Sequence, residues 1–163
     1  MLVILFLPSE EASGICRPWD DSYTVHSLGG SSGTFFSPDY PVNYPGNARC
    51  VWTIRVPAGK RVKLIFEDLD LQTTFYTCKS QSTSDMDFVQ IGDGQDTDNK
   101  ELAIYCGYQS FYSGFPAVHS TGRYMWVKFY SYSPKSSSKK GFKAHFEAVD
   151  LGKYYPLTLF FPW

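Results

Sequence analysis

The sequence carries little net charge and has no long apolar run, and both absences narrow the range of functions. Its 163 residues hold 15 lysines and arginines against 16 aspartates and glutamates, a formal net charge of -1. A chain without a basic excess has no broad attraction to nucleic acid or to an anionic membrane. No apolar run approaches the roughly 20 residues that span a bilayer. We therefore expect no nucleic-acid partner and no membrane span.

Histidine is scarce, and the motifs of common enzyme classes are missing. His26, His119 and His145 lie far apart in the chain. No serine lies in a G-x-S-x-G motif, and no C-x-x-C pair exists for zinc. Acidic pairs such as Asp85 and Asp87 would need a cleft for acid–base catalysis, and no pattern indicates one. The sequence predicts a protein without enzymatic activity and without a cofactor.

The four cysteines, Cys16, Cys50, Cys78 and Cys106, are widely spaced. Such spacing favours disulfides over a metal cluster, and disulfides persist in oxidising compartments. The predicted location is therefore extracellular or secreted.

The two ends of the chain differ from its middle. Residues 1–27 form a predicted N-terminal tail, whose apolar residues 2–7 are fewer than the core of an ordinary signal peptide. We interpret it as an atypical or truncated signal peptide; a fragment and a simple disordered tail stay open as alternatives. Residues 151–163 form a predicted C-terminal apolar tail. Between the tails we place one domain, residues 28–150, and we expect residues 1–30 to be irregular.

Short alternating runs fill that domain, and aromatic residues make up 18% of the chain. In "VWTIRV" the side chains of Trp52, Ile54 and Val56 share one face. Comparable runs follow in "RVKLIF", "DFVQI", "ELAIY", "YMWVKFYS" and "FKAHFEAV". Alternation with a period of two residues between turn signals predicts strands, and no stretch keeps a helical period. The expected fold is all-β, an antiparallel β-sandwich.

A proline-rich segment precedes the run "VWTIRV". Pro38, Pro41 and Pro45 fix their φ angles and donate no backbone hydrogen bond. We expect this segment to run extended along a sheet edge and to protect that edge from pairing. Tyr40 and Tyr44 are expected to bury their rings while their hydroxyls keep polar partners.

Five motifs in order carry a resemblance to a known family. They are "GGSSGTFFSPDYPVNYPGNARCVWTI", "LIFEDLDLQ", "CKSQSTSDMDFVQIGDG", "YCG" and "STGRYMWVKFYS" with "GFKAHFEA". Together they cover about residues 28–150 and resemble a CUB domain. The resemblance implies an extracellular β-sandwich with jelly-roll-like topology.

The resemblance also implies how the cysteines pair. Cys78 and Cys106 match the second disulfide of the family. The family's partner for Cys50 would stand where this chain has Leu28. Cys16 could reach Cys50 if the intervening segment folds back. A free, buried Cys50 and an intermolecular bridge from Cys16 stay open as alternatives.

Many CUB domains bind Ca²⁺, and the resemblance maps that site onto Tyr44, Gln72, Asp87 and Tyr132. The tyrosine and one aspartate are present, but Gln72 and Tyr132 stand where the family has acids. Calcium needs several hard oxygen ligands, mostly carboxylates. We expect no metal here. A rearranged site that draws on nearby acids stays open; these are Glu67, Asp68, Asp70 and Asp85.

The predicted function is non-catalytic, calcium-independent recognition of an extracellular protein of unknown identity. Exposed aromatic residues are the expected contacts, since tyrosine and tryptophan dominate interface hot spots. The loop 107–116 is rich in them. The candidate binding residues are Tyr44, Asp87, Tyr108, Phe111, Tyr112 and Tyr132.

Two alternatives stay open. One is a secreted carbohydrate- or glycosaminoglycan-binding protein similar to the spermadhesins, and the other is a fragment of a larger receptor or protease. Lys135, Lys139, Lys140 and Lys143 form either a small glycosaminoglycan patch or a solvated loop, and the interleaved serines favour the loop.

Overall fold

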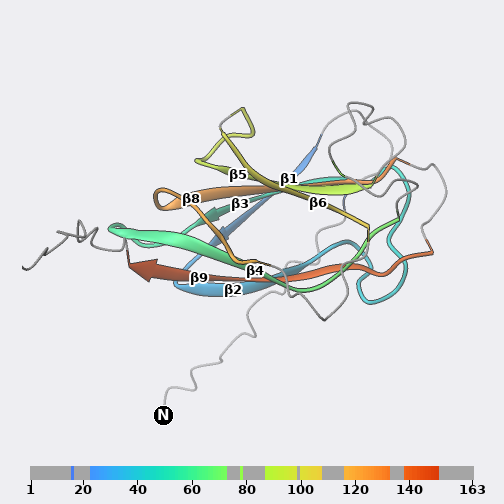
Figure 1. Ribbon diagram of the computed structural model, residues 1–163, viewed down its shortest axis with the longest axis horizontal. Coiled ribbons are helices and arrows are strands. Elements are labelled where there is room, and N and C mark those ends of the chain that lie inside the picture. Colours follow the sequence, from blue (N-terminus) through green and yellow to red (C-terminus); the bar gives the residue numbers. More distant parts are fainter. Residues whose placement is uncertain are drawn as a thin grey trace, which may run out of the picture.

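The computed structural model describes Cys16, residues 23–72, Cys78, and residues 87–98, 100–107, 116–132 and 138–150. Over these parts the chain forms two facing β-sheets and no helix (Figure 1). The expected β-sandwich is confirmed.

One sheet has five strands and the other has four. The five-stranded sheet has the order β1 (Thr24–Gly29), β3 (Arg49–Arg55), β8 (Tyr124–Tyr130), β5 (Phe88–Asp93) and β6 (Glu101–Cys106). The four-stranded sheet has the order β2 (Ser32–Phe36), β9 (Gly141–Asp150), β4 (Lys60–Asp70) and β7 (Val118–His119). All neighbouring strands are antiparallel except β1 and β3, which run parallel.

The first strand corrects one expectation. Residues 24–29 are not irregular but form β1, which pairs with β3 from Thr24 opposite Cys50 to Gly29 opposite Arg55. Its residues alternate between half-buried and exposed, and Leu28 packs against the core. Because this alternation involves mostly polar residues, the sequence pattern was too weak to reveal the strand.

The core confirms the alternation read from the sequence. Trp52, Ile54 and Val56 of the "VWTIRV" run are buried, and Phe142 lies at the centre of the packed rings. Edge-to-face contacts, with ring centroids 5.5–5.9 Å apart, join Phe142 to the rings of Phe35, Trp52, Phe66 and Phe129. Such arrangements are the favoured ones for aromatic pairs. Phe35 and Phe142 of the four-stranded sheet thus pack against Trp52 and Phe129 of the five-stranded sheet, so aromatic contacts join the two sheets.

The expectation for the proline-rich segment is wrong. Residues 38–42 form turns rather than an extended edge. They connect β2 of one sheet to β3 of the other, and β3 lies in the interior of its sheet, between β1 and β8. The prolines therefore shape a crossover between the sheets, where donating no hydrogen bond carries no penalty.

Both disulfides are formed. Cys78 is joined to Cys106, and Cys16 is joined to Cys50, with Cα atoms 5.7 and 5.5 Å apart. Cys16 and Cys50 are both buried. The bridge from Cys16 replaces the one that the family would make from position 28, where Leu28 packs as an apolar residue.

Candidate functional site

Four segments meet at the end of the sandwich where β9 begins, on the right in Figure 1. They bring together Tyr44, Gln72, Asp87 and Tyr132, the positions that the resemblance assigns to a calcium site. The Tyr44 hydroxyl donates to Asp87 Oδ2 at 2.6 Å and accepts from the Gln72 N–H at 2.8 Å. The Tyr132 N–H donates to Asp87 Oδ1 at 2.8 Å. Tyr44 and Asp87 thus join the connections that follow β2, β4 and β8 to the start of β5.

Two of the four residues of this cluster, Tyr44 and Asp87, are buried. Tyr44 is 0% exposed, and Asp87 is 5% exposed. The Tyr44 ring packs edge-to-face on Phe129, with centroids 5.2 Å apart. Tyr132, at 42% exposed, and Gln72 are the members that reach solvent. Of the candidate binding residues that the structure describes, Tyr132 is exposed and can touch a partner directly, whereas Tyr44 and Asp87 are buried.

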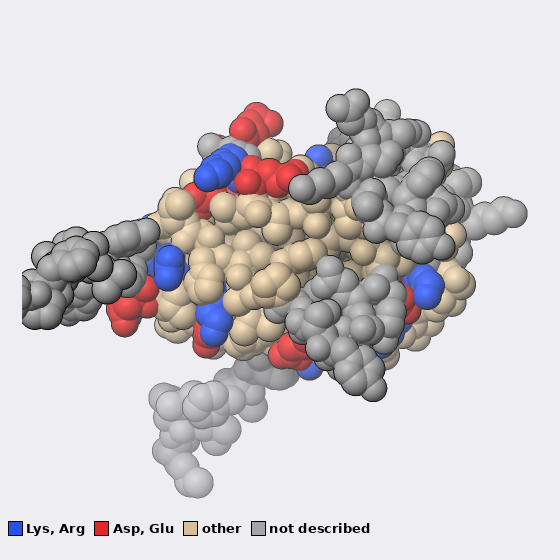
Figure 2. All heavy atoms as spheres, viewed as in Figure 1, with Lys and Arg blue, Asp and Glu red and all other residues tan. Residues whose placement is uncertain are grey.

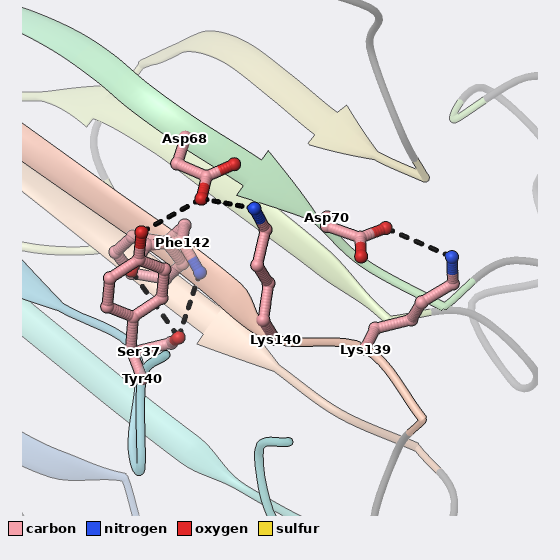
Figure 3. Close-up of polar contacts among 7 residues, drawn as sticks. All are labelled: Ser37, Tyr40, Asp68, Asp70, Lys139, Lys140 and Phe142. Atoms are coloured by element: carbon pink, nitrogen blue, oxygen red, sulfur yellow. Dashed lines mark hydrogen bonds and ion pairs between the residues drawn. The ribbon is translucent and has the colours of Figure 1, made fainter. Parts of the chain in front are cut away.

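Two buried serines hold the crossover in place, and no sequence pattern distinguishes them from the other serines. Ser37 Oγ accepts from the Phe142 N–H at 2.9 Å, as Figure 3 shows. Ser131 Oγ accepts from the Ala48 N–H at 2.8 Å and donates to the Pro45 carbonyl at 2.9 Å. These bonds satisfy buried backbone groups at both ends of the segment that carries Tyr44. They therefore position the Tyr44 ring.

The charge state of Asp87 reflects two opposed effects. Burial raises the pKa of its carboxyl group, and the hydrogen bonds from Tyr44 and from the Tyr132 N–H lower it in part. Both carboxylate oxygens are engaged by protein donors.

The described residues do not fit a calcium ion. Ca²⁺ takes about 6–8 oxygen ligands, usually with several carboxylates. Within the described part of the chain, no group of three or more His, Cys, Asp or Glu side chains could hold a metal. Asp87 is the one acid among Tyr44, Gln72, Asp87 and Tyr132. Asp85, which a rearranged site could have used, lies outside the described residues.

The other nearby acids are occupied by lysines. Asp70 pairs with Lys139 at 3.1 Å and Asp68 with Lys140 at 2.6 Å, as Figure 3 shows. The next pair along the same strands, Lys143 and Glu67, has a distance of 2.6 Å. These contacts draw the acids of β4 toward lysines at and before the start of β9, so Glu67, Asp68 and Asp70 each have a cationic partner. They also neutralise three of the four lysines of the predicted basic cluster; Lys135 lies outside the described residues.

Tyr40 adds a hydrogen bond to these ion pairs. Its hydroxyl donates to Asp68 Oδ2 at 2.8 Å, the oxygen that also contacts Lys140 (Figure 3). Burial and the bond to Asp68 raise the pKa of Tyr40 to about 12, so the phenol stays protonated at neutral pH. The expectation that Tyr40 and Tyr44 keep polar partners for their hydroxyls is confirmed.

The histidines occupy three different strands and two different sheets. His26 stacks on Trp52 with ring centroids 5.7 Å apart, and burial lowers its pKa. His145 Nδ1 lies 3.1 Å from Thr34 Oγ1 between β9 and β2. Desolvation is the largest influence lowering the pKa of His119.

The remaining candidate contacts, Tyr108, Phe111 and Tyr112, lie outside the described residues, as does most of the loop 107–116. Their role stays a prediction from the sequence.

Replacing Tyr44 with phenylalanine should lower the free energy of unfolding by about 2–3 kcal/mol. The change removes the donor to Asp87 Oδ2 and the acceptor for the Gln72 N–H while keeping the ring. Urea unfolding with intact disulfides measures the loss. Tyr132→Phe is the matched control, since the bond that this residue gives Asp87 comes from its backbone, and it should change stability by less than about 0.5 kcal/mol. Equal stability of the two variants would show that the Tyr44 hydroxyl does not hold the cluster together.

Comparison with protein families matches residues 25–146 to the CUB domain. Pig cubilin is 34% identical over 122 residues, which are 75% of this chain and 3% of cubilin. Human mannan-binding lectin serine protease 1 is 32% identical, over 80% of this chain and 18% of that protein. The chain therefore spans a small part of the length of these relatives.

Solved structures agree with this assignment. The CUB1-EGF-CUB2 domains of rat MASP-1 match with a TM-score of 0.63 and 30% identity, over 79% of this chain and 44% of that one. The full extracellular region of zebrafish Gpr126/Adgrg6 matches with a TM-score of 0.59 and 32% identity, over 79% of this chain and 15% of that one. The MASP-1 CUB2 domain, in a structure bound to Ca²⁺, matches with a TM-score of 0.58 and 25% identity, over 75% of this chain and 96% of that one.

Proposed function

Because the chain belongs to the CUB-domain family, we propose that it is a non-catalytic extracellular module that recognises a partner protein without Ca²⁺. The observation that carries the calcium-independent part is the engagement of both Asp87 carboxylate oxygens by the protein's own donors. Gln72 and Tyr132 stand at the positions where the family resemblance places acids. In this proposal the internal hydrogen bonds hold the converging segments together in place of a cation.

The extracellular part of the proposal is supported by two features. The chain carries two disulfides, which persist in oxidising compartments. One matched structure is described as an extracellular region. In the part of the chain that the structure describes, no helix is long and apolar enough to cross a membrane.

The partner-binding surface is proposed to include Tyr132, which is 42% exposed and whose backbone N–H donates to Asp87. Tyr108, Phe111 and Tyr112 are expected to add aromatic contacts beside it. A rigid aromatic ring loses little conformational entropy on binding, so such residues make efficient anchors.

The glycosaminoglycan alternative is less well supported. Glycan polyanions bind where several cations face solvent without acidic partners. Lys139, Lys140 and Lys143 each contact a carboxylate of β4 instead.

A direct test immobilises the full chain and measures its binding to a panel of extracellular protein domains, in millimolar Ca²⁺ and again in EDTA. We expect at least one domain to bind with the same affinity in both buffers. Loss of binding in EDTA would contradict calcium independence. Binding to a glycan array but to no protein domain would favour the spermadhesin-like alternative.

Calorimetric titration of the chain with Ca²⁺ should give no binding heat up to about 1 mM, the weak end of the range for extracellular modules. The double variant Gln72→Glu with Tyr132→Asp restores the acids that the resemblance assigns to the site, beside Asp87. It should gain measurable calcium binding and a calcium-dependent rise in Tm. A sub-millimolar affinity in the unmodified chain would overturn the prediction.

A further inference from the structure

A second feature lies at the opposite end of the sandwich from Asp87. Strands β5 and β8 pair from Phe88 opposite Tyr130, beside the Asp87 cluster, to Asp93 opposite Met125. At that far end lies a hollow of about 220 Å³. It is lined by Asp93, Gly94, Lys100, Thr121, Gly122, Arg123 and Tyr124.

The wall of the hollow is held by specific hydrogen bonds. The Thr121 N–H and hydroxyl donate to the two oxygens of Asp93 at 2.9 and 2.5 Å. The Gly94 N–H donates to the Tyr124 carbonyl at 3.2 Å, which ties the β5–β6 turn to the start of β8. The Asp93 carboxylate therefore has a structural role, and its charge is stabilised by the two hydrogen bonds from Thr121.

Two cationic residues, Lys100 and Arg123, line this hollow. The Arg123 Nε–H donates to the Val56 carbonyl at 3.1 Å, which fixes the guanidinium group. The Tyr124 ring has the guanidinium carbons of Arg123 and Arg55 at 5.5 and 6.0 Å from its centroid, within cation–π range. Of these two arginines, Arg123 belongs to the lining of the hollow, as does Lys100, whereas Arg55 does not.

These cations differ from those of the four-stranded sheet. Lys60 and Lys63 contact Asp150 and Glu147, and the three lysines at and before the start of β9 contact acids of β4. Among the described residues, no carboxylate forms an ion pair with Arg55, Lys100 or Arg123. Lys100 and Arg123 therefore line the hollow without an ion-pair partner among the described carboxylates.

We propose that this hollow binds the carboxylate of an aspartate or glutamate side chain presented by a partner protein. The inference rests on the proposed recognition function and names the chemistry of one contact. Arginine matches a carboxylate with two parallel hydrogen bonds, and the fixed Arg123 is already oriented. A volume of about 220 Å³ is below the roughly 300–1,000 Å³ of ligand pockets, so it suits one side chain rather than a whole ligand. The Tyr124 ring offers an apolar surface to the side chain's methylene groups.

A single carboxylate fits this place better than a sulfated glycan does. Asp96 and Asp98 are exposed on the adjoining β5–β6 turn, and Figure 2 shows acidic and basic side chains next to one another there. A long polyanion would cross these acids and be repelled, whereas one side chain entering the hollow meets only Asp93, whose oxygens are hydrogen-bonded.

The test is a titration followed by amide NMR at low ionic strength, with the full chain and N-acetyl-glutamate N-methylamide as the probe. We expect saturable shifts in the amides of Gly94, Lys100, Gly122 and Arg123, and none with the glutamine analogue. Lys100→Gln should weaken binding by about fivefold or more. Lys60→Gln is the charge-matched control, since Lys60 pairs with Asp150 on the other sheet, and it should leave binding unchanged.

Four results would overturn the proposal. The glutamine analogue could shift the same amides equally, or Lys100→Gln could bind the glutamate probe as well as the unmodified chain does. A heparin-derived tetrasaccharide could occupy the hollow more tightly than the glutamate probe, which would make the ligand a glycan. If a partner domain from the panel binds Lys100→Gln undiminished, the hollow is not its docking site, but the proposed recognition function stands.

Discussion

Replacing Gly141 with alanine is expected to lower the free energy of unfolding by about 3–5 kcal/mol. Gly141 begins β9 with φ at +88°, a conformation that is unfavourable for alanine. A Cβ atom at this position would overlap the hydroxyl and Cβ atoms of Ser37 and lie 3.3 Å from the Tyr44 ring. The Ser37 hydroxyl would have to move away from the Phe142 N–H, from which it accepts a hydrogen bond.

Thermal unfolding measures this effect, and Tm should fall on the order of 10 °C for a chain of this size. Gly122→Ala is the control, because a Cβ atom there meets nothing within 4 Å and its φ lies outside the left-handed region. It should change the free energy of unfolding by less than about 0.5 kcal/mol. A Gly141→Ala variant as stable as Gly122→Ala would show that the crossover segment adapts at no cost, contrary to the packing described for Ser37 and Tyr44.

Removing the disulfide between Cys16 and Cys50 should lower stability by about 3–4 kcal/mol in the chain-entropy view. The bridge closes a sequence separation of 34 residues, and both of its cysteines are buried. The variant combines Cys16→Ala with Cys50→Ala, and urea unfolding compares it with the unmodified chain. The bridge between Cys78 and Cys106 stays intact in both and acts as an internal reference.

Thiol alkylation supplies an independent check on the pairing. The unfolded, unreduced chain should take up no alkylating reagent, since its cysteines are all paired. The single variant Cys16→Ala should expose one reactive thiol, that of Cys50, and should be about as unstable as the double variant. A covalent dimer in the unmodified chain would instead support an intermolecular bridge from Cys16, which the structure contradicts.

The strands and the core could be predicted from the sequence because side-chain alternation is a local property. Trp52, Ile54 and Val56 point inward simply because they are two residues apart in extended backbone. The same reasoning missed β1, where the inward positions are Thr24, His26 and Leu28. Two polar residues in three gave no apolar pattern, so the pairing with β3 had to come from tertiary structure.

In the proline-rich segment the local backbone restriction was predictable, but its place in the fold was not. The φ restriction of each proline is a local property of the residue. Whether the segment lies along a sheet edge or crosses between sheets depends on where β2 and β3 lie. The two strands belong to different sheets, so Pro38, Pro41 and Pro45 fall in a connection between layers.

The candidate site was predicted in part. The resemblance identified the positions Tyr44, Gln72, Asp87 and Tyr132, and the structure brings them together. The sequence could not predict that both Asp87 oxygens would be engaged, because one donor is the backbone of Tyr132, which any residue there would supply. No sequence motif indicated the hollow at Lys100 and Arg123, because the residues that line it come from separate segments.

The sequence by itself determined the sandwich class, the inward faces of its main strands, the family and the loss of two acids from the calcium positions. Only the tertiary structure decided which charges meet. Strands β4 and β9 lie far apart in the chain, and their antiparallel register, with its irregularity between Phe66 and Asp68, places the acids of β4 beside the lysines near the start of β9. Long-range register depends on the packing of both sheets together, so no local pattern encodes it.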